Sequence, residues 1–447
     1  MDPDDECPAY TSCGGAGACE MIAVWSKTFG GGAYNKVTGF AVDSSGNSIV
    51  AGYFEGAVDF GGGSLVAVGV YDGFVAKFDS SGAHVWSKRF GNQDVGATGV
   101  AVDAADNVVL VGTLAGTMDL GGGALTSTGT DAFAAKLSPA GGHVWSRRFD
   151  GTSLPAPRAV ATSAAGDVFI GGNLAGTVDF GCGALASAGG DDVVVAKLTS
   201  AGACGWSRRF GDTSNQRVSA IAVDVAGDPV VTGNFDGALA IDGIPLTASG
   251  TDMFVAKLAG SNGVALWAKG AGSSQSDEGQ ALAVTASNEV VVGGYYAQSI
   301  DLGGGSLPVA ATGSYAGFVV KYDGVGGHAW SKGFINGNGR VHGLAVGAAQ
   351  AVLLSGWFTG YMDLGSGPLT SGGGVSGDAF LGVLSADGTP VSSDHFTSQG
   401  DAILSHIAVD GTGAVVVVGP LRPWAVVELG NGPLVGTQGE LLAKFLP

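Results

Sequence analysis

Side chains suited to binding a polar ligand stand where an otherwise regular sequence departs from its own pattern. They combine aromatic rings with amide, imidazole and charged groups: Arg217, Asn234, Asp277, Glu278, Gln280, Tyr295, Arg340, His342 and Trp357. Aromatic faces stack on sugars, and amide or charged groups supply the hydrogen bonds that orient a ligand. We therefore expect a site for a glycan, another small polar molecule or a surface protein. A rim that is merely solvated would have the same composition.

The regular pattern is a repeat. Tryptophans recur at intervals of 59 to 63 residues, and most of them begin the phrase Trp-Ser-Lys/Arg-x-Phe: Trp25, Trp86, Trp145, Trp206, Trp267 and Trp330. A degenerate seventh copy covers residues 391–396. Repetition at a fixed period indicates an architecture built from copies of one structural unit.

Each period contains four short apolar runs separated by turns rich in Gly, Asp and Ser, which is typical of four antiparallel strands. In the first period these runs cover residues 37–43, 48–54, 73–78 and 84–90. Four strands in a period of this length predict one blade of a β-propeller.

The two ends of the chain complement each other. A fourth-strand pattern lies at residues 24–29, and a third-strand pattern at residues 440–446 ends the chain. The sequence therefore predicts an all-β, seven-bladed β-propeller over residues 22–447, closed by the N-terminal strand that completes the last blade. Residues 1–21 form an acidic, Gly-rich leader that contains cysteines. A linear solenoid is the alternative.

One face of the predicted ring carries uniform tight turns, and the other carries long, divergent loops such as residues 55–71 and 270–279. We call the second the loop face and expect binding there. Five basic residues leave the repeat and fall at the loop-face ends of strands: Lys36, Arg158, Arg217, Arg340 and Arg422. They could receive an anionic group. The alternative is that they pair with loop acids: Asp94, Asp212, Asp277, Glu278 and Asp401.

The first strand of each blade should line the central channel. Its opening position is polar in every copy: Thr38, Thr98, Arg158, Ser219, Gln280, His342 and Ser405. The position two residues further on is apolar in every copy: Phe40, Val100, Val160, Ile221, Leu282, Leu344 and Ile407. The pattern predicts a polar channel mouth above an apolar wall.

An enzyme is the alternative to a binding module. A lactonase-like propeller hydrolase with a metal-assisted site could use Asp277 or Glu278 as base or metal ligand and His342 as acid or orienting group. His342 and His406 are one step out of register, so alternation predicts opposite strand faces and disfavours a metal pair. The sequence contains no Gly-x-Ser-x-Gly, His-Glu-x-x-His or phosphate-loop motif. A third hypothesis, a structural surface protein, needs no pocket.

The formal net charge of −19 argues against a nucleic-acid partner, whose phosphates need a basic surface. Because no stretch is apolar and long enough to span a membrane, we expect no transmembrane segment. Residues 1–6 lack the features of a signal peptide, so we expect a mature exported product, extracellular or on the cell surface. We also expect a monomer without a cofactor.

The cysteines fall into two groups. Cys182 and Cys204 depart from the repeat inside one blade, which predicts a disulfide and an oxidising compartment, with two free thiols as the alternative. Cys7, Cys13 and Cys19 lie in the leader at a spacing unlike that of a zinc knuckle, so we predict no metal there.

The repeat resembles a known family. The run from Asp72 to Lys77, followed by Gly82, Trp86-Ser87, Gly91 and residues 99–103, is similar to the SBBP repeat, a seven-bladed β-propeller of secreted and surface proteins of bacteria, myxobacteria among them. The resemblance covers essentially everything after residue 22. It implies shape and location but no reaction.

The chain departs from that family by an insert, Gly-x-x-Asp-Phe/Leu-Gly-x-Gly, between second and third strands. Its aspartates are Asp59, Asp119, Asp179, Asp301 and Asp363. Calcium could bind such carboxylates, but one acid per blade supplies too few ligands. We expect each aspartate to cap a turn.

Overall fold

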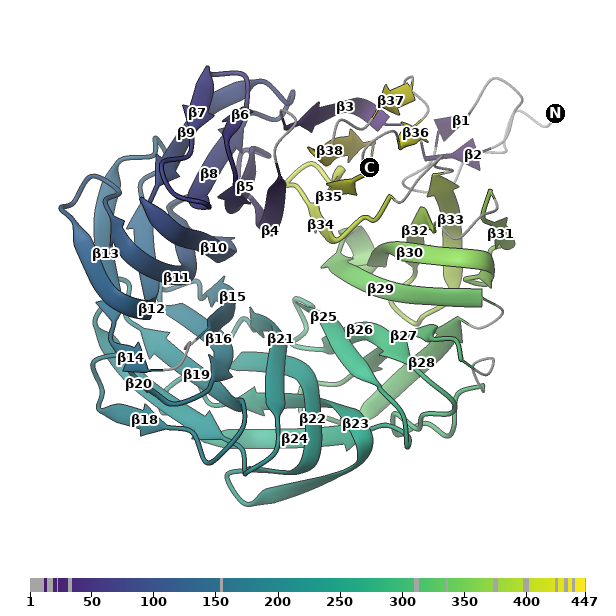
Figure 1. Cartoon of the computed structure of the whole chain (residues 1–447). Coiled ribbons are helices and arrows are strands. Elements are labelled where there is room, and N and C mark those ends of the chain that lie inside the picture. Colours follow the sequence, from purple (N-terminus) through teal and green to yellow (C-terminus); the bar gives the residue numbers. More distant parts are fainter. Residues whose placement is uncertain are drawn as a thin grey trace.

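The computed structural model describes residues 12–13, 19–21, 23–30, 34–152, 156–308, 313–334, 337–372, 377–396, 402–422, 425–429, 433–435 and 439–446. Seven sheets in this part of the chain share a path of four antiparallel strands and stand around a common centre (Figure 1). In each sheet we number the strands from the centre outward as first to fourth. The prediction of an all-β propeller is confirmed.

The strands of the first four sheets are β4 (Asn35–Val42), β5 (Ser48–Phe54), β8 (Asp72–Phe78) and β9 (His84–Phe90); β10 (Gln93–Val102), β11 (Val108–Met118), β12 (Leu125–Leu137) and β13 (His143–Phe149); β15 (Ala156–Thr162), β16 (Val168–Leu174), β19 (Asp192–Leu198) and β20 (Cys204–Phe210); β21 (Gln216–Val223), β22 (Pro229–Ile241), β23 (Ile244–Leu258) and β24 (Ala265–Ala271). Those of the other three are β25 (Glu278–Val284), β26 (Val290–Tyr296), β27 (Ala316–Tyr322) and β28 (His328–Phe334); β29 (Gly337–Val346), β30 (Val352–Asp363), β32 (Asp378–Leu384) and β33 (Pro390–Phe396); β34 (His406–Val409), β35 (Val415–Leu421), β38 (Gly439–Phe445) and β3 (Ala23–Phe29).

Short elements complete the described structure: β1 (Ser12–Cys13), β2 (Cys19–Glu20), β6 (Ala57–Asp59), β7 (Ser64–Val66), β14 (Gly151–Thr152), β17 (Thr177–Asp179), β18 (Ala184–Ala186), β31 (Pro368–Thr370), β36 (Val426–Glu428), β37 (Pro433–Val435) and the 3-10 turn η1 (Ala348–Gln350). Of the predicted leader, residues 1–21, the structure describes β1, β2 and Met21. β1 and β2 pair with each other, and Cys7 lies outside the described residues.

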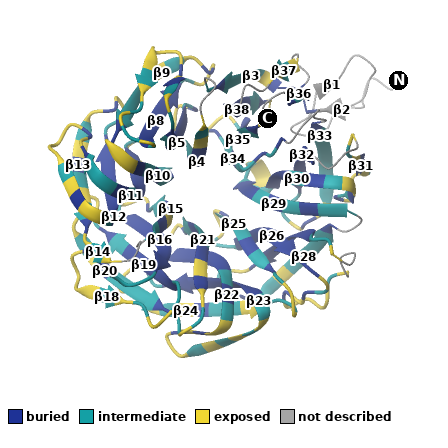
Figure 2. Ribbon diagram, in the orientation of Figure 1, coloured by how far each residue is buried: buried dark blue, intermediate teal, exposed yellow. Residues whose placement is uncertain are grey.

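The core lies between neighbouring sheets, because each sheet packs on both of its faces. Second and third strands such as β5 and β8 are therefore apolar runs rather than alternating ones, and almost all of their residues are buried (Figure 2). The outermost strands, such as β9, are half-exposed. The last sheet also contacts the first, since β34, β35 and β38 all touch β4.

The repeated tryptophans link each sheet to the next. Each indole Nε1 donates to a backbone carbonyl in the turn between third and fourth strands of the following sheet, at 3.0 to 3.3 Å. Trp25 of β3 makes this bond to Ser80 in the first sheet at 3.1 Å. A Cβ on Gly82, whose φ is 82°, would lie 3.0 Å from the Trp25 ring, so this glycine is needed for the close approach.

The repeated third-strand lysines are structural. Each forms an ion pair at 2.6 to 2.9 Å with a carboxylate near the end of a first strand or the start of a second: Lys77–Asp43, Lys136–Asp103, Lys197–Asp167, Lys257–Asp224, Lys321–Glu289 and Lys444–Asp410. In three of these six pairs both partners are buried: Lys77–Asp43, Lys136–Asp103 and Lys257–Asp224. They lie on the face of the tight turns, opposite the loop face.

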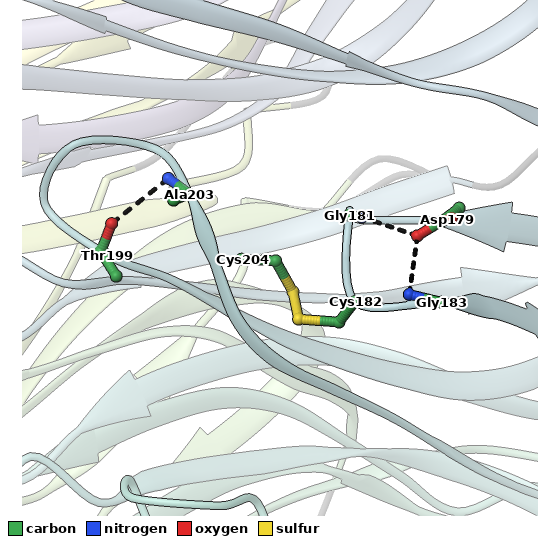
Figure 3. The surroundings of a disulfide bond; sticks show 7 residues. All are labelled: Asp179, Gly181, Cys182, Gly183, Thr199, Ala203 and Cys204. Carbon is green, nitrogen blue, oxygen red and sulfur yellow. Dashed lines mark hydrogen bonds between the residues drawn. A yellow bond between two sulfur atoms is a disulfide. The ribbon is translucent and has the colours of Figure 1, made fainter.

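Cys182 and Cys204 form a disulfide with a Cα–Cα distance of 5.7 Å (Figure 3), which confirms the predicted pair. In three other sheets the equivalent positions hold a glycine and a histidine: Gly62 and His84, Gly122 and His143, and Gly304 and His328. The His84 ring covers Gly62 so closely that a Cβ there would lie 2.1 Å from it. The disulfide therefore replaces, by a covalent bond, a contact that these three sheets make by packing.

The aspartates of the insert cap turns, as expected. Asp179 Oδ1, for example, accepts hydrogen bonds from the backbone N–H groups of Gly181 and Gly183 at 2.7 and 3.1 Å (Figure 3). Asp59, Asp119 and Asp301 repeat both bonds, and Asp363 repeats the first. The Oδ1 atom of each of these aspartates is thus used within its own turn.

Candidate functional site

The seven first strands enclose a channel with a volume of about 260 Å³. It is lined by the seven polar and the seven apolar positions that the sequence places on the channel, from Thr38 and Phe40 to Ser405 and Ile407. In six first strands the polar residue is skipped in the pairing register, which marks a β-bulge: Thr38, Thr98, Arg158, Ser219, Gln280 and His342. A bulge re-aims a side chain out of the strict alternation of a strand.

A second hollow of about 360 Å³ adjoins the channel and opens toward the loop face. The two share Thr38, Thr98, Arg158, His342, Ser405 and His406. Lys36, Val37, Ile403, Pro420 and Glu440 complete the wall of the second. We call this second space the channel-mouth hollow; most of its wall comes from the last sheet and the first three.

Glu440 is the most unusual residue of this wall. It is 1% exposed, its Oε1 accepts a hydrogen bond from the backbone N–H of Val37 at 3.0 Å, and its Oε2 has no partner among the described residues. Burial raises the pKa of the Glu440 carboxyl to about 8, while the Val37 N–H and the charge of Lys36 act in the opposite direction. At neutral pH the carboxyl is therefore protonated in most molecules.

Two histidines line the same hollow. Burial lowers the pKa of His342 to about 4, and the nearby Arg340 guanidinium and His406 imidazole act in the same direction. Burial also lowers the pKa of His406 to about 4, against a bond to the backbone of Thr38. Both imidazoles are neutral at pH 7. His406 Nδ1 lies 2.9 Å from Ser405 Oγ, and His342 Nε2 has no partner among the described residues.

His342 and His406, which strand alternation predicts on opposite faces, both line the hollow. His342 stands at the bulge of β29, where alternation fails. His406 opens β34, whose pairing with β35 begins only at this residue.

Two off-repeat cations reach the hollow without a carboxylate partner. Lys36 and Arg158 line it with exposed side chains, and neither forms an ion pair with another described residue. Arg217 lies elsewhere and pairs with Asp191 at 2.8 Å, not with the loop acids considered from the sequence, of which Asp401 lies outside the described residues.

Part of the predicted cluster forms a connected network beside the channel. Glu278 accepts hydrogen bonds from Ser219 Oγ at 2.8 Å and from Tyr295 Oη at 3.1 Å. The guanidinium of Arg340 lies over the Tyr295 ring at 4.1 Å and over the Tyr315 ring at 4.6 Å. These groups hold one another across the fourth, fifth and sixth sheets.

The other predicted residues are dispersed. Asp277 is fully buried and accepts bonds from Ser273 and from the N–H of Ala297, with burial raising its pKa. Gln280 lines the channel. Asn234 of β22 and Trp357 of β30 lie within second strands, where they pair with Arg217 and Arg340, and they line neither hollow. Asp277 thus holds a loop, which does not suit the role of a base.

Sequence reasoning missed Glu440 as a site residue, although a signal was present. Across the sheets its position in the third strand holds Gly73, Ala132, Val193, Met253, Gly317, Ala379 and Glu440. The other sheets carry a small or apolar residue at this position. The carboxyl of Glu440 is therefore a departure from the repeat.

The described residues also bear on a metal site and on a membrane span. They contain no group of three or more His, Cys, Asp or Glu side chains placed to hold a metal ion. None of their helices is long and apolar enough to cross a membrane.

The radial sheets and their lined centre define a β-propeller, and this assignment rests on the sheet topology of the chain itself. No family model matches the chain. It is similar to an uncharacterized WD repeat-containing protein of Acanthamoeba polyphaga mimivirus, with 34% identity over 102 residues, which are 20% of this chain and 7% of that protein.

Solved structures that are similar to this chain have low sequence identity to it. The Pan2 WD40 domain of Neurospora crassa is 9% identical, with 93% of this chain and 90% of that chain covered and a TM-score of 0.48. The quinohemoprotein alcohol dehydrogenase of Comamonas testosteroni is 12% identical, with 95% and 76% covered and a TM-score of 0.46. A europium-containing methanol dehydrogenase is 10% identical, with 95% and 93% covered and a TM-score of 0.45.

Proposed function

We propose that this protein is an exported or cell-surface binding module that holds a small polar molecule, or the polar end of a glycan or surface protein, in the channel-mouth hollow. In this proposal it is a monomeric, seven-bladed propeller of SBBP type and bacterial origin, closed by its N-terminal strand. The Cys182–Cys204 disulfide supports an oxidising compartment.

One observation carries the proposal. Glu440 Oε2 and His342 Nε2 are both buried, both lack a partner among the described residues, and both residues line the same hollow. A buried polar atom without a hydrogen bond costs about 1–3 kcal/mol. A ligand that bonds to both atoms recovers this cost, so the hollow is better suited to a polar occupant than to an apolar one.

The other residues that line the hollow also suit a polar occupant. Thr38, Thr98 and Ser405 also line the hollow, and their hydroxyl oxygens can accept hydrogen bonds from a molecule rich in polar atoms. In the predicted cluster, Tyr295 is bonded to Glu278 and the Arg340 guanidinium lies against two tyrosine rings, but Arg340 lines neither hollow.

A glycan array and a metabolite thermal-shift screen of the full chain test the proposal. Compounds that raise the melting temperature are measured again with Thr98→Trp, which fills the hollow, and with Val325→Trp, which adds the same side chain on an exposed turn of the opposite face. The proposal predicts that Thr98→Trp abolishes the shift and Val325→Trp preserves it. Equal shifts in both variants contradict it.

A further inference from the structure

The two cations of the channel-mouth hollow differ from the repeated third-strand lysines. The chain is acidic, with a formal net charge of −19, and every repeated third-strand lysine has a carboxylate within 2.9 Å. Lys36 and Arg158 instead enter the hollow without an ion pair among the described residues. Their charges are therefore available to a ligand.

The other titratable groups of the wall do not neutralise them. Glu440 is the carboxyl residue of this lining, and its raised pKa keeps it protonated at neutral pH, while His342 and His406 are neutral. The hollow therefore carries positive charge in a negatively charged molecule. That charge opposes a metal ion and attracts an anion.

We propose, on the basis of the function proposed above, that the channel-mouth hollow binds the oxyanion group of an acidic sugar, either carboxylate or phosphate. Lys36 and Arg158 are its charged donors, and Glu440 is a neutral donor through Oε2. The threonine and serine hydroxyl groups of the wall face the hydroxyl groups of the sugar.

Hydrogen-bond geometry assigns the role of Glu440. Its Oε1 already accepts the N–H of Val37, so the proton of the neutral carboxyl belongs on the unpartnered Oε2. An oxyanion accepts hydrogen bonds only, and it therefore matches a wall made of an ammonium, a guanidinium and a carboxyl O–H. The planar guanidinium of Arg158 can also hold two oxygens of one oxyanion at once.

The proposal is tested by titrating the full chain, labelled with ¹⁵N-histidine, with glucose, glucuronate and glucose 6-phosphate. His342 and His406 line the hollow, whereas His84, His143, His328 and His395 lie in fourth strands and serve as internal references. We expect both acids to shift the His342 and His406 resonances at concentrations at least about tenfold lower than glucose requires.

Charge-removing variants test the donors. Lys36→Met and Arg158→Met should each weaken binding of the acids by about 10- to 100-fold, the range expected for a charge-assisted hydrogen bond. Arg208→Met is the matched control, because Arg208 lies in the outer strand β20 and bonds to the carbonyl of Asn262. It should leave binding unchanged.

Each outcome decides one of the two proposals. A response to only one acid supports the inference and identifies the oxyanion. Equal binding of glucose and the acids, or acid binding unaffected by Lys36→Met and Arg158→Met, overturns the inference and leaves the proposed function standing. No response to any of the three sugars also overturns it, whereas the proposed function falls only if the wider screen finds nothing that Thr98→Trp blocks.

Discussion

The Glu440 carboxyl accepts a hydrogen bond from the backbone N–H of Val37 at 3.0 Å, across 403 residues of sequence. The bond joins β38 of the last sheet to β4 of the first. The other oxygen of the same carboxyl is buried without a partner among the described residues, and Glu440 also lines the channel-mouth hollow. One side chain therefore belongs both to the contact between these two sheets and to the candidate site.

Replacing Glu440 with glutamine should change how stability depends on pH. The folded pKa of about 8 lies above the ordinary value of 4.5, so the wild-type protein loses stability as pH rises between these values, because only the unfolded chain ionises. Glu440→Gln removes this loss. The free energy of unfolding of the variant, relative to that of wild type, should therefore rise by up to a few kcal/mol from pH 5 to pH 8, at about 1.4 kcal/mol for each pKa unit. Urea unfolding across this range measures it. A difference that does not vary with pH would refute the protonated carboxyl.

The two histidines that line the hollow should affect stability at acidic pH. The pKa of His342 is lowered from 6.5 to about 4, so protonation of the unfolded chain reduces stability as pH falls from 6.5 toward 4. His342→Gln should lessen this decline by no more than about 3 kcal/mol. His406→Gln should do the same, because its imidazole pKa is lowered to the same value. Thermal melts between pH 4 and 7 that run parallel in wild type and variants contradict this account.

Deleting residues 1–30 should destabilise the propeller. The deletion removes β3, which pairs with β38, together with the Trp25 bond to Ser80 and the buried ring of Phe29. Loss of one buried aromatic side chain alone costs about 3–5 kcal/mol. Calorimetry should show a clearly lower melting temperature. Deletion of residues 1–20, which leaves Met21 and β3 in place, is the control, and equal melting of the two truncations would mean that β3 does not stabilise the ring.

Removing the disulfide should lower stability by about 3 kcal/mol, because the bond closes a loop with a sequence separation of 22 residues. Cys182→Ser with Cys204→Ser removes the bond and leaves no substitute. Cys182→Gly with Cys204→His instead restores the pair found at Gly62 and His84, so it should recover part of the loss. Urea unfolding of both double variants checks this. Equal stability of the two would mean that the histidine contact contributes nothing.

The fold could be predicted from the sequence because its main contacts are repeated. The tryptophan period reflects one bond, from each indole to a carbonyl of the following sheet, and the third-strand lysines reflect one ion pair. The Cys182–Cys204 pair was predictable for a related reason, since both residues break the repeat in the same sheet.

The candidate site could be predicted only in part, because it depends on contacts that the repeat does not contain. The bulge at His342 overrides the alternation from which opposite faces were inferred. The burial of Asp277 depends on Ala297, and the pairing of Arg217 depends on Asp191, in loops whose shape the period does not determine. Glu440 acquires its role from Val37, at the other end of the chain.

A crystal structure of the complex with a compound from the binding screen tests the central claim most directly. The account predicts that the compound occupies the channel-mouth hollow, within hydrogen-bond distance of Glu440 Oε2 and His342 Nε2. A compound bound on the tight-turn face or against Trp357, with only water in the hollow, would contradict it.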